Sequence, residues 1–564
     1  MKPVFFLLIG CALCSLFSTT CFAQSRVPAM DSMIASAGRA DWKAAVHWAL
    51  KAGEAVPAEK NWRLLNAAIF ASHDRNADLA LYYVTQVVNS DIAVKASYNN
   101  NFDWLRDDPR WLKLMQRVDE LREEERQQRI KASLPFRNSQ QILLGETAGY
   151  LDSLRQIPSA AQLYQEIQKQ SPKHSDSHAG RYAYAWIKLS DTLEFPYLVQ
   201  LPPNFDSNKS YPLIVVLHGA VGRQTMLREV ADSIGVNFFG REFAEQALQF
   251  GMIAVFPYST SRYNWMMPDD GFDLVPQLVR QIKKMYPVND RRVYVAGHSN
   301  GATGAFSYLM KQPGLFAGFA GVNNRPEVRT GGTFLKNGVN RSFYNISTDL
   351  DYYFPLEGHR AITSLAKQLG VDWQNHEISG NRNHSYMIVS RDSTVKEAYR
   401  KLFENLLSKE RNPFQPALYW ECDDTRHGRS DWLEITGLDT LEARASWHKE
   451  VNTAVTGWRE VVKPEILLDS TSNAFAFPRR SGAVQASYAN NRFELTTSGV
   501  KSVAIYLSPE MVDFGRPVQV FINGKMVHNA SVEESRSSLL DEYSREFDHQ
   551  AIWTNRLQFT LPQR

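Results

Sequence analysis

The spacing of apolar residues divides the chain into three regions. From about residue 31 to 132, apolar side chains recur every three or four positions, as in Trp42, Ala45, Val46 and Ala49, which predicts amphipathic helices. From residue 181, short unbroken apolar runs alternate with helical patterns. After residue 411, short alternating runs predominate. The pattern therefore predicts a helical region, an α/β region and a β-rich region, in that order.

The first region, residues 24–132, has the texture of a helical repeat. Residues 61–88 predict two short helices interrupted at residues 72–76, with alanines at close-packing positions. This pair resembles a tetratricopeptide repeat, although one or two repeats are fewer than such arrays usually contain. No catalytic constellation accompanies the helices, so we expect them to brace the protein or to bind a protein partner.

Residues 133–180 are expected to form a linker. His174 and His178 stand four residues apart, a spacing that would place both on one helix face. Pro172, Ser175 and Ser177 argue against a helix there, so we do not expect a metal site.

The middle region, residues 181–410, predicts a sheet covered by helices on both faces. The runs 182–187 and 195–199 predict an antiparallel pair. The runs that follow are apolar throughout, as expected of parallel strands buried on both faces. These runs are residues 213–217, 252–256, 293–296, 316–322 and 343–346. Helical patterns lie between them, so this region is expected to be an α/β domain.

The last region, residues 411–564, predicts a small β-rich domain. Two apolar runs joined by Asn523-Gly524 predict a tight hairpin. The aromatic residues of this region have two interpretations: they fill its core, or they form an exposed platform for a sugar ring. The residues in question are Tyr419, Trp420, Trp458 and Trp553. The second interpretation would make the domain a carbohydrate-binding accessory.

The N-terminus predicts export. Lys2 precedes an almost wholly apolar stretch, residues 4–17, and Cys21-Phe22-Ala23 offers a small-x-small cleavage site before Gln24. Residues 1–23 are therefore expected to be a signal peptide, which places the mature protein in the periplasm or outside the cell. An uncleaved anchor and a lipoprotein signal at residues 8–11 remain as alternatives. No later stretch is apolar enough to span a bilayer.

Composition removes several classes of protein. Hydrophobic residues make up 44% and charged residues 22%, which excludes collagen-like and wholly disordered chains. The net charge of +3 is too small to indicate a nucleic-acid binder. Three of the four cysteines lie in the predicted signal peptide, so Cys422 alone remains. The mature chain can form neither an internal disulfide nor a cysteine-based zinc site, and we expect Cys422 to be a packing residue.

A candidate nucleophile lies where the strand 293–296 runs into Gly297-His298-Ser299-Asn300-Gly301, followed by a helical pattern. This is G-x-S-x-G between a strand and a helix, the context in which the motif lifts a serine above a sheet. Backbone N–H groups at the start of the helix favour an oxyanion, so Asn300 is one candidate donor.

A second candidate donor lies upstream of the serine. The strand 213–217 ends in His218-Gly219-Ala220. In proteins with a serine on such a strand-to-helix turn, the loop after an upstream strand supplies an oxyanion donor. The backbone N–H of Ala220 or Val221 is the predicted donor. His218 is expected to be structural rather than a proton carrier.

The general base must follow an acid in the chain order Ser, Asp, His. Seven histidines meet this condition: His359, His376, His384, His427, His448, His528 and His549. The last four fall in the β-rich region. His359 lies on a helical pattern and His376 within a strand, whereas His384 lies in the polar loop 380–385 that follows this strand. A loop beyond a strand's carboxyl end can reach Ser299, so His384 is the preferred base, with His376 as the alternative. The acid is Asp349 or Asp351, both just after the strand 343–346.

These motifs together resemble secreted α/β-hydrolase esterases of the polyhydroxybutyrate depolymerase and feruloyl or acetylxylan esterase group. The matching segments are residues 211–219, 290–301, 351–355 and 383–385. The resemblance favours Asp351 as the acid, since related esterases carry an Asp four residues before a Pro, and it implies no metal or organic cofactor. Two positions depart from the group: Ala302 replaces a common Gly, and Ser347-Thr348 replaces His-Gly. Close inference of the substrate therefore fails.

The sequence thus predicts an α/β-hydrolase fold that cleaves carboxylic esters, with Ser299, Asp351 and His384 as the catalytic residues and Ala220 and Asn300 as oxyanion donors. The expected substrate is an ester, which could be linked to a polysaccharide. Two other functions stay open: a peptidase of the prolyl-oligopeptidase type, and a non-catalytic binding protein on a hydrolase scaffold.

Overall fold

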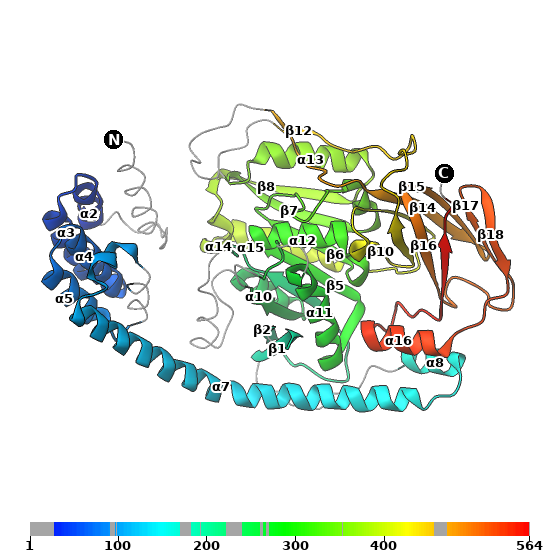
Figure 1. Ribbon diagram of the computed structural model, residues 1–564, viewed down its shortest axis with the longest axis horizontal. Helices are drawn as coiled ribbons and strands as arrows, with labels where there is room; N and C mark the ends of the chain where they lie inside the picture. The colour runs from blue at the N-terminus through cyan, green and yellow to red at the C-terminus, as the bar shows by residue number, and fades with distance from the viewer. Residues whose placement is uncertain are drawn as a thin grey trace. The chain divides into compact units, whose positions relative to one another are not determined.

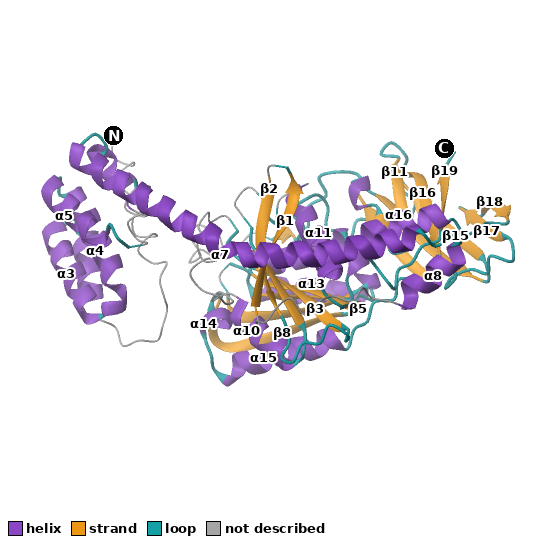
Figure 2. Cartoon of the chain, turned by 90° about the horizontal axis from the view of Figure 1, so that it is seen from below, coloured by secondary structure: helices purple, strands orange, loops and turns teal. Residues whose placement is uncertain are grey.

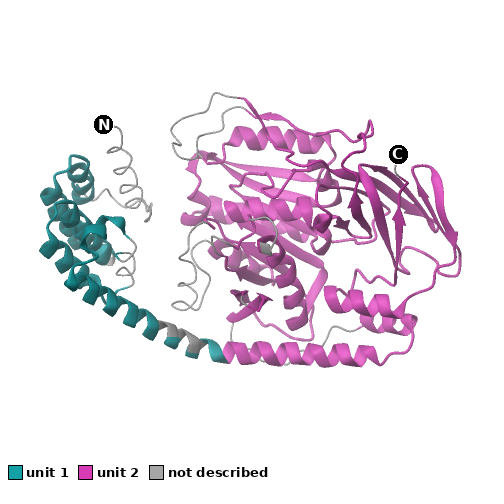
Figure 3. Cartoon of the chain, viewed as in Figure 1, with its two compact units in different colours: residues 1–134 teal, residues 135–564 magenta. Residues whose placement is uncertain are grey.

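The computed structural model describes residues 28–90, 96, 99–169, 182–191, 193–221, 240–259, 263–266, 270–351, 353–455 and 471–562. The chain divides into two compact units, residues 1–134 and 135–564 (Figure 3). The predicted signal peptide, the His174/His178 pair and Trp458 lie outside the described residues.

The first unit is built from short helices, each packed against the next along the chain (Figure 2). They are α2 (Pro28–Gly38), α3 (Trp42–Ala55), α4 (Lys60–His73) and α5 (Ala77–Val87), with 3₁₀ turns η1 (Pro57–Glu59) and η2 (Asn100–Leu105). The side chain of Asp41 caps α3 and that of Asn76 caps α5. Buried alanines, among them Ala45, Ala49 and Ala68, allow close approach of the helices.

Helix α7 (Pro109–Arg155) and helix α8 (Ala160–Lys169) run through most of the segment 133–180 that the sequence assigned to a linker, so this segment is largely helical. Contacts inside the second unit hold the C-terminal part of α7 in place. Gln140 accepts a hydrogen bond from the Trp186 N–H (2.8 Å) and donates one to the Trp186 carbonyl (2.7 Å). These bonds satisfy part of the free edge of the first strand, and Leu143 is buried in the core.

The second unit contains an eight-stranded, mostly parallel sheet in the order β1-β2-β4-β3-β5-β6-β7-β8 (Figure 1). The strands are β1 (Tyr182–Ser190), β2 (Leu193–Gln200), β3 (Tyr211–Leu217), β4 (Ile253–Pro257), β5 (Val288–His298), β6 (Gly318–Val322), β7 (Ser342–Leu350) and β8 (Trp373–Asn383). Strand β2 pairs antiparallel with β1 and β4, and all later pairs are parallel. With a strand–turn–helix at the end of β5, this is the α/β-hydrolase arrangement.

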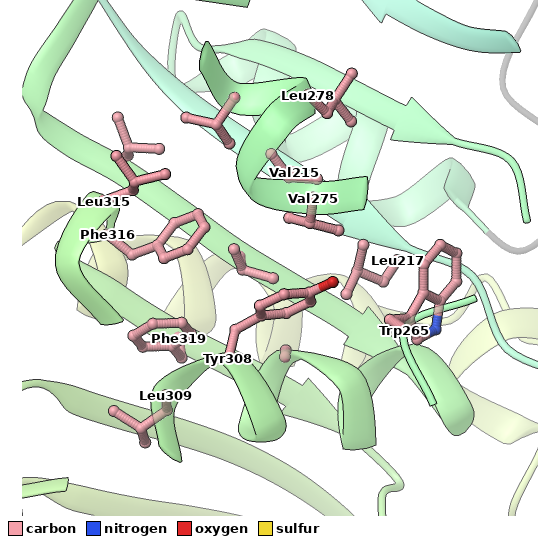
Figure 4. Close-up of a cluster of buried hydrophobic side chains, with 14 of the residues drawn as sticks. Val215, Leu217, Trp265, Val275, Leu278, Tyr308, Leu309, Leu315, Phe316 and Phe319 are labelled. Carbon is pink, nitrogen blue, oxygen red and sulfur yellow. The ribbon is translucent and has the colours of Figure 1, made fainter. Parts of the chain in front are cut away.

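Helices cover both faces of this sheet. The helices are α10 (Arg241–Gln249), α11 (Asp270–Met285), α12 (Asn300–Lys311), α13 (Leu356–Gln368), α14 (Tyr386–Val389) and α15 (Ser393–Leu407), with 3₁₀ turns η5 (Pro313–Leu315) and η6 (Leu335–Asn340). One apolar cluster joins the sheet to α11, α12 and α13, and another joins it to α10 and α15. Figure 4 shows the first cluster, where Tyr308 of α12 lies among residues of β3 and α11.

Residues from 417 onward form two packed sheets. Strands β9 (Ala417–Cys422), β14 (Gly482–Ala489), β15 (Arg492–Ser498), β17 (Val518–Ile522) and β18 (Lys525–Ala530) form one sheet, and β10 (Arg429–Ser430), β11 (Leu433–Leu438), β16 (Val500–Leu507) and β19 (Asn555–Thr560) the other. β12 (Ala454–Val455) pairs with β13 (Ser472–Asn473), and η7 spans Thr425–His427. The hairpin predicted at Asn523-Gly524 joins β17 and β18, with positive φ at both turn residues.

One interpretation of the sequence made four aromatic residues of the β-rich region an exposed platform for a sugar ring. It was wrong for the three of them that the structure describes. Tyr419, Trp420 and Trp553 are 7%, 0% and 4% exposed. Burying these large apolar rings stabilises a region that has no disulfide to hold it together, which explains why they lie in the core. Cys422 is also fully buried, as expected of a packing residue, and burial raises the pKa of its thiol to about 12.

The β-rich region belongs to the same compact unit as the α/β region. Buried ion pairs join the two: Lys311 of α12 with Asp423 (2.8 Å), and Arg341 with Asp431 (2.6 Å). Lys283 of α11 pairs with Asp548 (2.8 Å). Helix α16 (Arg536–Glu546) also packs beside α8 (Figure 2). Because breaking one partner of a buried pair is costly, these contacts fix the β-rich region on the hydrolase fold.

None of the described helices combines the length and the apolar character needed to cross a bilayer.

Candidate active site

The turn between β5 and α12 holds Ser299 in an unusual backbone conformation. Its φ is 56° and its ψ is −123°, a region that non-glycine residues occupy at a cost. The Ser299 N–H donates to the carbonyl of Val322 on β6 (2.9 Å), and its own carbonyl accepts from the Thr303 N–H (3.0 Å). The neighbouring strand and the first turn of α12 therefore impose this strained turn.

The glycines on either side of Ser299 are required by space. A Cβ at Gly301 would collide with the carbonyl of Leu217 on β3, and one at Gly297 would collide with the backbone of Gly301. Such contacts with backbone atoms have no way to relax. The G-x-S-x-G spacing thus lets α12 begin directly against β3, with its free N–H groups beside Ser299.

The loop after β3 lies against Ser299. A Cβ added at Gly219 would be 3.0 Å from the Cβ of Ser299. The next residue, Ala220, has a φ of 54°. This loop therefore brings the backbone N–H groups predicted as oxyanion donors to the same end of β5 as the candidate nucleophile.

His218 fixes the orientation of this loop. Its Nε2 accepts from the Ser259 N–H (3.2 Å), so Nδ1 carries the proton and donates to the carbonyl of Gly219 (2.7 Å). Because the carbonyl and the N–H of a trans peptide point in opposite directions, the Ala220 N–H points away from His218. Burial lowers the pKa of His218 to about 4, so the ring is neutral and serves as a fixed hydrogen-bonding group.

Asp351 and His384 meet at the carboxyl ends of β7 and β8. The Nδ1 of His384 lies 2.8 Å from Oδ2 of Asp351, and both side chains are buried. The other oxygen of Asp351 accepts from the N–H groups of Tyr353 (2.9 Å) and Phe354 (3.0 Å). The rings of Tyr353 and Phe354 contact the imidazole edge-on. Asp351 is thus held as an acceptor for the Nδ1–H of His384.

Asp349 has a different place. Its carboxylate accepts hydrogen bonds from the N–H groups of Gly380 (2.9 Å), Asn381 (3.1 Å) and Arg382 (2.7 Å). Burial favours the neutral form, yet these backbone bonds lower the pKa of Asp349 below its ordinary value. Asp349 closes the bend in β8. The polar loop predicted at residues 380–385 is mostly strand, because β8 continues to Asn383 through this bend.

The other candidate histidines lie elsewhere. His376 is inside β8, where its Nδ1 lies 3.2 Å from the hydroxyl of Tyr344. His359 is on α13, and burial lowers its pKa to about 4. In the β-rich region His448 lies 3.0 Å from both Ser498 and Glu421, a similar set of groups. Ser498, His448 and Glu421 are 1%, 2% and 6% exposed, so a substrate has no access to the hydroxyl of Ser498.

Two residues beside His384 carried no role in the sequence-based prediction. The carbonyl of His384 accepts from the side chains of Asn323 (2.8 Å) and His298 (3.1 Å). The place of His298 inside G-x-S-x-G is the one signal that could have drawn attention to it. Asn323 follows β6 without any motif. Across the described residues, no group of three or more His, Cys, Asp or Glu side chains could hold a metal ion.

Comparisons with known proteins agree with hydrolase chemistry at this site. The family described as "Putative esterase" matches residues 193–325, a range that contains the loop after β3 and Ser299 but ends before Asp351 and His384. No curated protein matches the chain.

Several solved structures resemble a part of the chain. A thermostable esterase is 19% identical over 41% of this chain and 64% of its own, with a TM-score of 0.34. Est1E from Butyrivibrio proteoclasticus is 15% identical over 40% of this chain and 99% of its own (TM-score 0.30). An acylaminoacyl peptidase from Pyrococcus horikoshii is 17% identical over 41% of this chain and 42% of its own (TM-score 0.32). These TM-scores are too low to support a function, so the support for a hydrolase comes from the family match.

Proposed function

We propose that this protein is a serine hydrolase that cleaves carboxylic esters, with Ser299 as nucleophile, His384 as general base and Asp351 as the acid that orients it. The observation that carries the proposal is the 2.8 Å hydrogen bond between Asp351 and His384. It lies at the carboxyl ends of the parallel strands, where the turn after β5 presents Ser299. The family match to residues 193–325 favours esters as the substrate class.

The reaction follows from these roles. The Oγ of Ser299 attacks the ester carbonyl while Nε2 of His384 takes its proton, and Asp351 stabilises the resulting imidazolium. The proton then passes to the leaving alcohol as the C–O bond breaks, which leaves an acyl-enzyme. Water gives a proton to His384 and attacks the acyl carbonyl. Ser299 regains the proton as the carboxylic acid departs.

The backbone N–H groups of Ala220 and Asn300 stabilise the oxyanion. Asn300 is the first residue of α12, where N–H groups have no partner inside the helix. The Ala220 N–H is oriented by the bond from His218 to the Gly219 carbonyl. Donors fixed before the reaction begins are worth about 2.7–4 kcal/mol each, since they need no reorganisation when charge develops.

A substrate panel tests this function. Chromogenic acyl esters of increasing chain length and aminoacyl amides are offered to the wild-type protein and to Ser299→Ala. The proposal expects turnover of esters by the wild type and none by the variant. Preferential turnover of aminoacyl amides would identify a peptidase instead, and equal turnover by both proteins would remove Ser299 from the mechanism.

We also propose that residues 1–23 direct export, which would place the enzyme in the periplasm or outside the cell. The support is the sequence pattern alone: Lys2, the apolar stretch 4–17 and the small residues before Gln24. N-terminal sequencing of the mature protein from its native source tests this, with Gln24 as the expected first residue and Met1 as the contrary result.

A further inference from the structure

We propose that His298, the residue before the nucleophile, is a positioning residue that holds the general base His384 in place through its backbone. The inference rests on the proposed function, because it assigns a role in placing the base of that reaction. It concerns a residue that neither attacks the substrate nor carries its proton.

The contact that carries the inference joins the ends of two strands. The Nε2 of His298, the last residue of β5, lies 3.1 Å from the carbonyl oxygen of His384, which follows β8. The two imidazole rings are 4.9 Å apart between centroids. His384 belongs to a turn that leads into the short helix α14, so its main chain needs external anchors. His298 supplies one such anchor from the strand that carries Ser299.

The bond fixes the protonation of His298. A carbonyl only accepts, so Nε2 carries the proton and donates. Burial, and secondarily the nearby His384, lower the pKa of His298 to about 3, so the ring stays neutral. A neutral His298 donates one hydrogen bond from its Nε2–H and adds no charge beside the base.

The other nitrogen of His298 is a sign of functional placement. Nδ1 is buried and has no hydrogen-bond partner among the described residues. A buried acceptor left without a partner costs about 1–3 kcal/mol, so an apolar side chain would suit this position better for stability alone. The benefit that offsets this cost is the bond from Nε2.

His298 also touches the oxyanion loop. A Cβ at Gly219 would be 3.1 Å from the carbonyl of His298 and 3.5 Å from its Nδ1. One side chain therefore lies against the loop that carries the Ala220 N–H and bonds to the turn that carries the base. We infer that His298 fixes the positions of the nucleophile, the oxyanion loop and the base relative to one another.

A second donor shows how specific the arrangement is. Asn323, just beyond β6, donates to the same His384 carbonyl (2.8 Å) and accepts from the Thr348 N–H (3.0 Å). The carbonyl is thus held from β5 and from β6. Loss of one donor weakens the anchor without releasing the turn, which predicts a fall in kcat and an intact fold.

The test compares two side chains of similar shape at position 298. His298→Gln keeps an N–H donor near the position of Nε2, whereas His298→Met has none. We expect His298→Met to lower kcat by roughly 10–100-fold, since a misplacement of about 1 Å can cost 10²-fold. The KM and the thermal unfolding midpoint should change little. His298→Gln should restore most of the lost kcat.

His427→Met is the matched control, because His427 is another buried neutral histidine, located in the β-rich region, whose Nδ1 also has no hydrogen-bond partner among the described residues. Its kcat should equal that of the wild type. Equal kcat values for His298→Gln and His298→Met, at any level, would overturn the inference, because the donor would then have no effect.

Failure of the inference is distinguishable from failure of the proposed function. If the wild-type protein hydrolyses esters through Ser299 and the two variants at position 298 behave alike, the positioning role alone is wrong. If the wild type hydrolyses no ester and no amide, the proposed function is wrong, and the role of His298 falls with it.

Discussion

The two ends of helix α12 show opposite designs. At its N-terminus Ser299 has a strained backbone, the first N–H groups are free, and Nδ1 of His298 has no described partner. At its C-terminus Lys311 is fully buried and bonds to Asp423 at 2.8 Å, while the Met310 carbonyl accepts from Asn337 (3.0 Å). The N-terminal end thus leaves the free N–H groups and Nδ1 of His298 without described partners, whereas at the C-terminal end the Lys311 ammonium and the Met310 carbonyl both have one.

This difference indicates how the fold supports strain. Residues 301–311 of α12 are all buried, so the helix is held along its length by the core. The ion pair with Asp423 and the bonds from Asn337 tie its far end to the β-rich region. A firmly held helix can keep a costly turn at its start. Changes at the N-terminal end should therefore reduce catalysis, and changes at the C-terminal end should reduce stability.

The largest expected effect is at the acid. Asp351→Asn should lower kcat by about 10⁴-fold, because the amide presents its N–H groups to Nδ1 and the imidazole is held in the wrong tautomer. Asp349→Asn, at the neighbouring carboxylate that binds three backbone N–H groups, should keep near-normal kcat. Steady-state kinetics on a soluble ester separate the two. A crippled Asp349→Asn beside a normal Asp351→Asn would reverse the assignment.

The next effect is at the oxyanion loop. Gly219→Ala forces a Cβ to within 3.0 Å of the Ser299 Cβ, so the loop must shift away from the nucleophile. We expect kcat to fall by about 10²–10³-fold, the usual cost of a lost oxyanion donor. Gly149→Ala is the control, since nothing lies within 4 Å of a Cβ there and it is on α7. Unchanged kcat in Gly219→Ala would show that this loop does not act in the reaction.

At the other end of α12, Lys311→Met should act on stability. It leaves Asp423 buried without its main partner, which typically lowers the free energy of unfolding by about 3–5 kcal/mol. Below the unfolding temperature kcat should stay close to that of the wild type. Lys188→Met removes an exposed pair with Asp191 and should cost at most about 1 kcal/mol. Chemical denaturation measures both, and equal losses would contradict the view that the buried pair fixes the helix.

A smaller, graded effect concerns pH. The buried rings of His218, His298 and His359 have lowered pKa values of about 4, 3 and 4. In the unfolded chain these rings take up protons below about pH 6.5, whereas the folded rings stay neutral. Each of these rings therefore lowers the free energy of unfolding as pH falls below that point.

The carboxylates add to this loss at lower pH. Although burial opposes ionisation, Arg411 and Lys283 hold the pKa of Asp548 well below its ordinary value. A lowered folded-state pKa gives stability above about pH 4 that is lost as pH falls further. Thermal unfolding midpoints between pH 8 and 4 should decline below pH 6.5 and more steeply near 4. A constant midpoint from pH 7 to 5 would contradict the neutral burial of these histidines.

Local sequence patterns were sufficient to predict the strands and the turn that carries Ser299. Apolar runs at residues 213–217 and 293–296 could only be buried strands, and glycines at 297 and 301 already implied a close approach of backbones. Helix α7 was missed beyond residue 132 because its polar face gives no strong helical period; docking through Gln140 and Leu143 maintains it. The same limit applies to His298 and Asn323, whose bonds depend on which strands become neighbours.

The central claim is that Ser299 is the nucleophile. A fluorophosphonate probe, followed by mass spectrometry of the digested protein, tests it most directly, because the probe reacts with a serine that an adjacent base has activated. The account predicts one adduct, on Ser299, that is absent in Ser299→Ala and strongly reduced in Asp351→Asn. Labelling at another serine, or undiminished labelling of Ser299→Ala, would contradict it.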